Sequence, residues 1–134
     1  MAQGVSGWLL LLCRLLVVFH PLLLAITASN ALSAIPARGT AVALILILRL
    51  AVVGFGMAAG RALQTVQPGA VTLGKAALVA SAATDLFVYT TPYFPNNRMP
   101  GDTIYYVAAS LAYHGAWITY LVRSKRVRST YADV

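Results

Sequence analysis

The hydrophobic positions of this chain fall into four long stretches, which short polar or proline-containing segments separate. The clearest stretch runs from Ala41 to Leu63 and carries a single charged residue, Arg49. An α-helix rises about 1.5 Å per residue, so this stretch would reach about 34 Å, enough to cross a hydrocarbon layer of about 30 Å. The same criterion predicts membrane-spanning helices over residues 5–28, 40–63, 71–90 and 103–122.

Residues 29–39, 64–69 and 91–102 are expected to form the connections between these spans. Connections this short force neighbouring helices to run in opposite directions. The expected fold is therefore an all-α membrane protein, an antiparallel bundle of four transmembrane helices that forms one domain over residues 1–134. The third span is expected to be the least hydrophobic of the four.

The first stretch has a rival interpretation as a cleaved signal peptide, because Ala-x-Ala-like sites follow it near Ala31 and Ala34. No Lys or Arg precedes the stretch, it is longer than a usual signal, and Arg14 interrupts it, so a retained span is favoured. Pro21 has no backbone N–H to donate, which predicts a kink near His20.

The composition excludes an ordinary soluble domain, since 60% of the residues are hydrophobic and only 10% are charged. The net charge of +7 could suggest nucleic-acid binding in a soluble protein. Here the basic residues concentrate in the tail, residues 123–134, directly after an apolar helix. They are Arg123, Lys125, Arg126 and Arg128. This arrangement favours anionic lipid head groups as the partner and not nucleic acid.

The basic residues also predict the orientation of the bundle. One side would hold Arg61, Lys75 and the four basic residues of the tail, whereas the other would hold Arg38 and Arg98. Cytoplasmic segments are enriched in Lys and Arg, so the first side should be cytoplasmic. With an even number of spans, both termini are then expected in the cytoplasm.

Small residues mark the faces on which these helices are expected to pack. Gly56 and Gly60 lie on the same face of the second span as Arg49 and would let another helix approach closely. On the third span, Ser81 lies one turn before Asp85 in a stripe of small residues. Both charged residues should therefore point toward protein and not toward lipid.

Five ionisable side chains fall inside the predicted spans: Arg14, His20, Arg49, Asp85 and His114. A central Arg or Asp costs about 2.5–3.5 kcal/mol in hydrocarbon, so such residues need partners or a function. Measured from the outer face, Asp85, His20, Arg49 and His114 should lie about 9, 12, 14 and 16 Å deep. These four residues are expected to form one polar layer, with Arg14 nearer the cytoplasm.

Opposite charges in lipid should pair, and we therefore expect an ion pair between Arg49 and Asp85. The pair could simply lock the helix arrangement, or the layer could form a path for a proton or a solute. His20 and His114 at similar depth offer a further interpretation as the axial ligands of a b-type haem. Either histidine could instead accept a structural hydrogen bond.

Motifs of known enzyme chemistry are missing. The chain has no Gly-rich phosphate loop, no H-E-x-x-H pair, no cluster of cysteines and no nucleophile elbow. Its three acidic residues, Asp85, Asp102 and Asp133, are predicted to lie far apart, which disfavours paired-carboxylate catalysis. The sequence predicts neither an enzyme nor a metal site, and no cofactor is expected.

The outer loop combines Tyr93, Phe94, Arg98 and Met99 with three prolines. These side chains could recognise a partner, although aromatic residues at this position more often anchor a protein at the membrane interface.

The two ends of the chain carry a resemblance. The chain opens with GVSGWL over residues 4–9 and closes with WITYL over 117–121, followed by RSKRVRSTY over 123–131. This resembles the YdgK-like family of small bacterial inner-membrane proteins, which begin with a Gly-x-Gly-Gly-Trp-Leu-like segment and end with a Trp-x-x-Tyr helix and a Ser-x-Arg-Val-Lys-x-Thr-Phe-like tail. Ser6 stands for the usual Gly and Tyr131 for the usual Phe. The resemblance implies four spans and brings no assigned reaction.

The function expected from these observations is that of a non-enzymatic accessory or scaffold subunit, which associates with another membrane protein or with itself through its helices and tail. The alternative is a small oligomeric transporter or channel that uses the polar layer of His20, Arg49, Asp85 and His114. A haem-bearing redox anchor is the third hypothesis.

Overall fold

The computed structural model describes residues 7–91 and 101–132, and these residues are helical apart from short turns. No strand occurs within those two ranges. The elements in chain order are α1 (Gly7–Arg14), the π-helix η1 (Leu15–Phe19), α2 (His20–Arg38), α3 (Thr40–Gln64), α4 (Ala70–Thr90), α5 (Thr103–Arg123) and α6 (Lys125–Thr130). The prediction of an all-α protein is therefore confirmed.

Three helical segments of the described chain are long and apolar enough to cross a membrane: Gly7–Ser29, Thr40–Gln64 and Ala70–Thr90. They support the prediction of a membrane protein. The expectation that the third span would be the least hydrophobic is wrong, because α4 meets the criterion and α5 does not. Helix α5 is less apolar because Tyr105, Tyr106, Tyr113 and His114 interrupt its hydrophobic residues.

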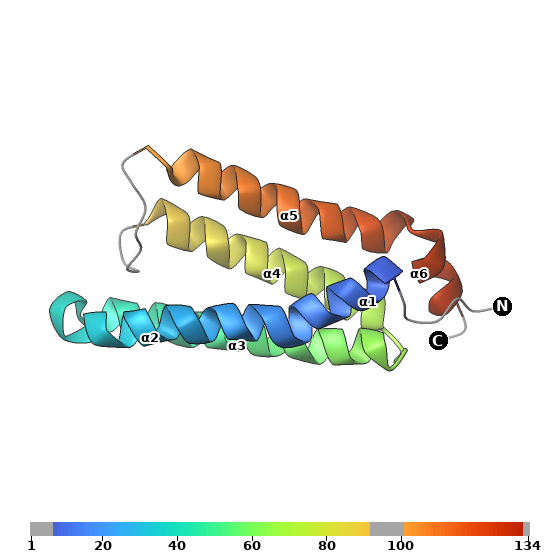
Figure 1. The fold of residues 1–134 in the computed structure, drawn as a ribbon, viewed down its shortest axis with the longest axis horizontal. Coiled ribbons are helices and arrows are strands. Elements are labelled where there is room, and N and C mark those ends of the chain that lie inside the picture. Colours follow the sequence, from blue (N-terminus) through green and yellow to red (C-terminus); the bar gives the residue numbers. More distant parts are fainter. Residues whose placement is uncertain (1–6, 92–100, 133–134) are drawn as a thin grey trace.

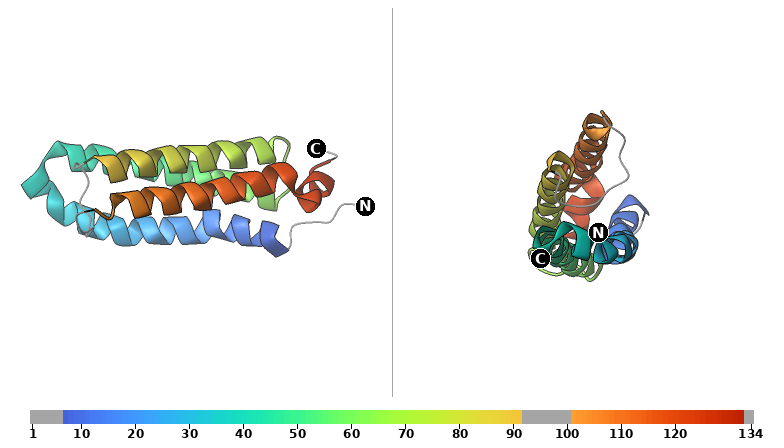
Figure 2. Two further views of the ribbon diagram at one scale, coloured as in Figure 1. Left: turned by 90° about the horizontal axis from the view of Figure 1, so that it is seen from above. Right: turned by 90° about the vertical axis from the view of Figure 1, so that its left-hand side faces the viewer.

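The long helices lie side by side along one direction (Figure 1). In chain order, α2 packs on α3, α3 on α4, and α4 on α5, while α1 and η1 also pack against α3. Helix α1 begins at the end of the molecule where α6 lies, as two further views show (Figure 2). We call this end the tail end, and the opposite end, where α4 finishes and α5 starts, the loop end.

The first long helix changes its hydrogen-bonding pattern just before its proline. Within η1, the N–H of His20 donates to the carbonyl of Leu15, five residues earlier instead of four. Pro21 follows directly, in the first turn of α2, where a missing N–H is tolerated. The first long helix changes direction over η1, as Figure 1 shows between α1 and α2, so the bend predicted near His20 coincides with this π-helical segment.

The connection expected over residues 29–39 is wrong for most of its length, because α2 continues to Arg38. This stretch contains three alanines, which have the highest helix propensity, and Pro36 does not break it. The helix ends at Gly39, whose backbone φ of +83° is readily adopted only by glycine.

Two groups of buried side chains hold the helices together. The larger group, which we call the tail-end cluster, consists of Leu9, Leu12, Cys13, Leu16, Ala62, Leu63, Ala70, Leu78, Leu121 and Val127. The smaller loop-end cluster consists of Leu24, Val42, Ile45, Leu46 and Val88. The tail-end cluster joins α1, η1, α3, α4, α5 and α6, whereas the loop-end cluster joins only α2, α3 and α4.

Candidate functional site

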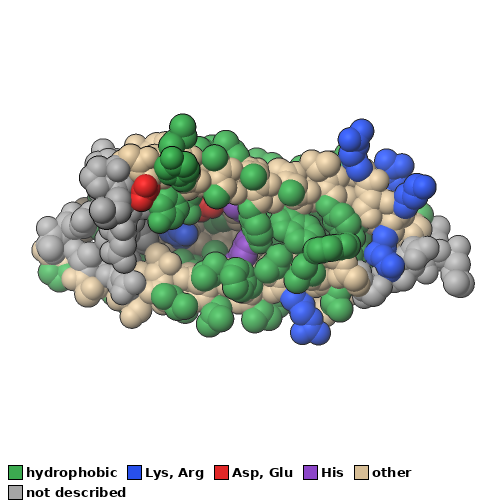
Figure 3. Space-filling model, turned by 45° about the horizontal axis from the view of Figure 1, so that its top comes forward, with side chains coloured by type: hydrophobic (Ala, Val, Ile, Leu, Met, Phe, Trp, Pro, Cys, Tyr) green, Lys and Arg blue, Asp and Glu red, His purple; other side chains and the backbone are tan. Residues whose placement is uncertain are grey.

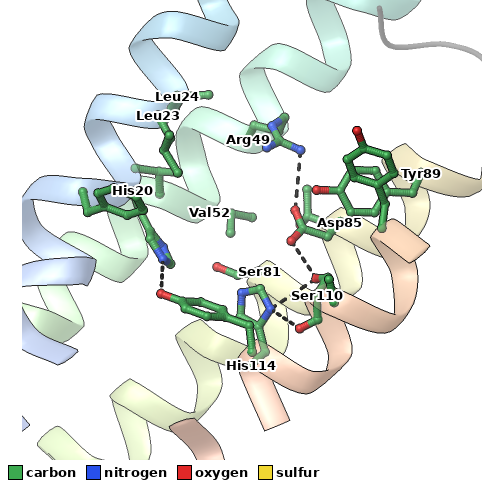
Figure 4. A pocket seen from close by; sticks show the side chains of 16 residues that line it. His20, Leu23, Leu24, Arg49, Val52, Ser81, Asp85, Tyr89, Ser110 and His114 are labelled. Carbon is green, nitrogen blue, oxygen red and sulfur yellow. Dashed lines mark hydrogen bonds and ion pairs between the residues drawn. The ribbon is translucent and has the colours of Figure 1, made fainter. Parts of the chain in front are cut away.

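A cavity of about 370 Å³ lies among the long helices, beyond the tail-end cluster, and we call it the chamber. Every one of the four longest helices contributes a side chain with a polar or ionisable group to its wall (Figure 4). The residues lining it are Phe19, His20, Leu23, Leu24, Arg49, Val52, Val53, Ser81, Thr84, Asp85, Tyr89, Tyr106, Ala109, Ser110, Tyr113 and His114.

Glycines of α3 fix where the first long helix lies relative to the chamber. A Cβ atom on Gly60 would come within 2.7 Å of Val17 Cγ2 and 3.0 Å of Leu16 Cβ, so a larger residue cannot fit there without displacement. A Cβ atom on Gly56 would meet Leu16 Cδ2 at 3.6 Å. This close approach of η1 to α3 sets the position of His20, which follows η1 immediately.

Arg49 of α3 and Asp85 of α4 face each other inside the chamber. Their nearest atoms, Arg49 Nη1 and Asp85 Oδ1, are 3.7 Å apart, and the two side chains are 21% and 19% exposed. The distance allows an ion pair but not a tight bidentate contact. The structure thus brings together the two charges whose pairing the sequence predicts.

Ser110 of α5 connects this ion pair to a histidine. Its hydroxyl donates to Asp85 Oδ2 at 2.8 Å and lies 3.3 Å from Nδ1 of His114. His114 Nδ1 also lies 2.9 Å from the Ser110 carbonyl. Because a carbonyl can only accept, Nδ1 carries the proton, and in the neutral ring Nε2 is the accepting atom. Arg49, Asp85, Ser110 and His114 therefore form one connected polar series.

His20 and Tyr113 join the two sides of the chamber. Nε2 of His20 lies 2.9 Å from the hydroxyl of Tyr113, which links α2 to α5. The His20 ring stands at 67° to the ring of His114, with 6.4 Å between their centres. Tyr113 packs edge-on against His114 at 5.0 Å. The aromatic rings of three neighbouring side chains thus form one wall.

All four residues of the predicted polar layer line the chamber, and so does Ser81. Arg14 is exposed, away from the chamber. Sequence analysis missed Ser110 and Tyr113. The i, i+4 spacing of Ser110 and His114 on one helix face could have identified the first. The position of Tyr113 opposite His20 depends on how two distant helices are rotated, which no local pattern gives.

The basic tail folds back onto the tail end of the molecule. Val127 of α6 is buried in the tail-end cluster, and the Tyr131 hydroxyl donates to the carbonyl of Leu63. Burial raises the pKa of Tyr131 above its ordinary range. Of the four predicted lipid-facing basic residues, Arg123, Lys125 and Arg128 are exposed and Arg126 is half-buried. Basic side chains gather at this end (Figure 3).

The loop residues Tyr93, Phe94, Arg98 and Met99, singled out for partner recognition or interface anchoring, lie outside the described residues.

The chemistry available in the chamber is binding and proton exchange. Ser110 resembles no activated nucleophile, since its hydroxyl donates to a carboxylate and the neighbouring Nδ1 is itself a donor. A haem between two imidazoles needs each ring to present a nitrogen to the same iron. Nε2 of His20 instead faces the Tyr113 hydroxyl, so the geometry does not favour this hypothesis. Within residues 7–91 and 101–132, no group of three or more His, Cys, Asp or Glu side chains could hold a metal ion.

Comparisons of the chain with protein-family models, with curated proteins and with solved structures gave no match.

Proposed function

We propose that α5 is a fourth membrane crossing, so that four antiparallel helices span a bacterial inner membrane with both termini in the cytoplasm. Helix α5 has 21 residues, as many as α4, and packs along it. Its outer face presents Ile104, Leu111 and Val122, whereas Ser110 and His114 are buried. This distribution is the one expected of a helix that faces lipid on one side and a polar interior on the other.

The distribution of charge supports the same orientation. The exposed basic residues Arg61, Arg123, Lys125 and Arg128 lie at the tail end, which the proposal places in the cytoplasm next to anionic head groups. We also propose membership in the YdgK-like family, on the strength of the matching segments at the two ends of the chain.

In function, we propose a small membrane transporter whose single binding site is the chamber. The observation that carries this proposal is that ionisable side chains from four helices, His20, Arg49, Asp85 and His114, line one cavity inside otherwise apolar helices. A structural ion pair needs no cavity beside it. Intramembrane carboxylates and histidines that border a cavity are typical of proton and solute pathways.

The chamber is also closed on one side. The tail-end cluster fills the space between the chamber and the tail end with fully buried leucines, including Leu12, Leu16 and Leu78. Toward the loop end, the loop-end cluster joins α2, α3 and α4 but contains no residue of α5, so the chamber is less closed on that side. Unequal closure toward the two faces of the membrane is what a carrier presents in one of its two access states.

The test is proton flux in proteoliposomes loaded with a pH-sensitive dye under an imposed potential. Asp85→Asn keeps the shape of the side chain and removes its charge, and we expect it to abolish flux above the leak of empty vesicles. Asp102→Asn is the matched control, because Asp102 precedes α5 and lines no part of the chamber. Equal flux in the wild type, both variants and empty vesicles would contradict the proposal.

The accessory-subunit hypothesis keeps support from one observation. Helix α5 packs on α4, and along its length it leaves small residues exposed at positions four apart, Ala108, Ala112 and Ala116. Small residues favour close helix–helix contact in lipid. Crosslinking in native membranes tests this hypothesis: Ala112→Leu should abolish any crosslinked species that involves α5 while leaving Asp85-dependent flux intact.

A further inference from the structure

We infer that the chamber takes a lipid-soluble molecule with a small, uncharged, hydrogen-bonding head and an apolar tail, and that this molecule enters sideways between α2 and α5. The inference rests on the proposed transport function and names the class of its substrate. It follows from four features of the chamber: its open side, its rim, its charge and its size.

The open side lies between the first and the last long helix. Each long helix packs on the next one in the chain, but α2 and α5 are not among the pairs in extended contact. Among the described residues, His20 joins them at the chamber, through its hydrogen bond to Tyr113 and its ring contact with His114. Figure 3 shows the result as a hollow in the surface, with basic, acidic and histidine side chains visible inside it.

The rim of this opening is apolar on both sides. Phe19 and Leu23 border it on the first helix and are each 46% exposed, while Tyr106 and Ala109 border it on α5. In the proposed orientation, this rim lies at the depth of the acyl chains, because His20 and Arg49 are about 12 and 14 Å from the outer face. An apolar rim around a polar interior matches a molecule that has an apolar tail and a polar head.

The charges inside the chamber favour an uncharged head. The guanidinium of Arg49 and the carboxylate of Asp85 already balance each other at 3.7 Å. An anionic or a cationic head would therefore add a net charge to a site whose two formal charges already offset each other, at the cost of its own desolvation. A hydroxyl or carbonyl head can instead donate to Nε2 of His114 or accept from Arg49 without adding a charge.

The size of the chamber implies that a tail must remain outside. A volume of about 370 Å³ equals the space of about twelve water molecules in the liquid, enough for a small head group and roughly ten carbon atoms, so the rest of a longer tail stays outside. The tail-end cluster closes the chamber toward the tail end. A longer apolar tail of the bound molecule would therefore leave through the gap between α2 and α5. Lateral entry from lipid is therefore the route that suits an amphipathic molecule.

The experiment uses the full-length protein in vesicles of phosphatidylethanolamine and phosphatidylglycerol. The probe is a hexadecanol that carries a photoreactive diazirine next to its hydroxyl. After illumination, mass spectrometry should map the adducts to chamber residues of α2 and α5. Unlabelled hexadecanol should compete about tenfold better than palmitate, whose head is anionic, or propanediol, which lacks the tail.

Matched variants test the entry route from both sides. Ala109→Trp fills the opening from α5, and Ala108→Trp places the same side chain one position earlier on an exposed site outside the chamber. Leu23→Trp and Leu22→Trp form the corresponding pair on α2. We expect the rim variants to lower chamber labelling by about tenfold, since overfilling a packed site costs that much in occupancy, and the control variants to leave it unchanged.

The outcomes separate this inference from the proposed function. Asp85-dependent flux without chamber labelling overturns the inference and leaves the transporter intact, as does equal labelling in the rim and control variants. Chamber labelling without flux supports the lateral site and overturns transport. The two pairs of variants are independent, and size-exclusion profiles identify any variant that fails to fold.

Discussion

The helices pack differently in the two ends of the molecule. At the tail end, glycines at positions 60 and 74 let helices approach until leucines from α1, α3, α4 and α5 interlock. Toward the loop end, α4 and α5 diverge from α2 and α3 (Figure 1), and polar side chains border the space that remains. The tail end is thus a sealed half, and the other is a hollow half.

The comparison shows how an apolar chain can hold a polar site. The hollow half contains an arginine, an aspartate and two histidines, each of which is costly to bury alone. The sealed half carries no such group in its buried cluster and can supply the packing that keeps the helices together. The proposed functional site and the larger buried cluster therefore lie in different halves of the molecule.

The largest effect should come from breaking the ion pair in the hollow half. Arg49→Met leaves the Asp85 carboxylate without its cation, and we expect a loss of about 3–5 kcal/mol, measured by thermal unfolding in detergent. The double variant Arg49→Met, Asp85→Leu should recover most of that loss. Arg14→Met is the control, because Arg14 is exposed. If the double variant were as unstable as Arg49→Met, the two charges would not stabilise each other as a pair.

Leucine truncations compare the two halves directly. Leu12→Ala in the sealed half should cost about 3–4 kcal/mol, because it opens a void in a fully buried cluster. Leu24→Ala, which lines the chamber, should cost about 2 kcal/mol, since it enlarges a space that already exists. Denaturant titration of both variants measures the difference. Equal losses would mean that the two halves are packed alike.

Two glycines of α3 test how much close helix packing contributes to stability. Gly60→Ala should destabilise the protein by about 1–3 kcal/mol, because the new Cβ atom would lie 2.7 Å from Val17 Cγ2. Gly54→Ala places the same methyl group in open space and should be neutral or stabilise by about 0.5–1 kcal/mol. The midpoint of thermal unfolding should therefore be lower than that of the wild type for Gly60→Ala and equal to it or higher for Gly54→Ala.

The smallest effect concerns Tyr131, which attaches the tail to the sealed half. Burial raises the pKa of its phenol above the ordinary value of 10.0, so the neutral form is favoured in the folded protein. The stability that it contributes is present below pH 10 and is lost as the pH rises from there toward the folded pKa. Trypsin cleavage within α6 should accelerate over this range.

A matched pair of tyrosine variants controls that measurement. Tyr131→Phe should cost about 1 kcal/mol through the lost hydrogen bond and should remove the pH dependence of cleavage. Tyr105→Phe should change neither, because Tyr105 is exposed. Cleavage that accelerates equally with pH in wild type and Tyr131→Phe would assign the effect to another group.

Several parts of the fold could be predicted from the sequence. The long apolar stretches identified three helical segments that are long and apolar enough to cross a membrane, and α3 and α4 begin and end within one residue of the predicted spans. The expectation for residues 29–39 failed because a proline and a few polar residues were weighed above the high helix propensity of alanine. The hydropathy of α5 was overestimated for a similar reason, since its aromatic residues were counted as apolar.

The candidate site was predicted only in part. His20, Arg49, Asp85 and His114 could be placed in one layer, because depth along a helix follows from counting residues. Ser110 and Tyr113 escaped prediction. Their partners lie on other helices, and which side chains meet depends on the rotation of each helix about its axis.

The sequence by itself determined that this protein is helical and that three of its helical segments are long and apolar enough to cross a membrane, because hydropathy and helix propensity are sums over neighbouring residues. Only the tertiary structure decided which helices pack together, where the chamber forms and on which side it opens. Those features depend on side-chain shapes that meet across long separations in the chain, such as Gly60 against Val17 and His20 against Tyr113.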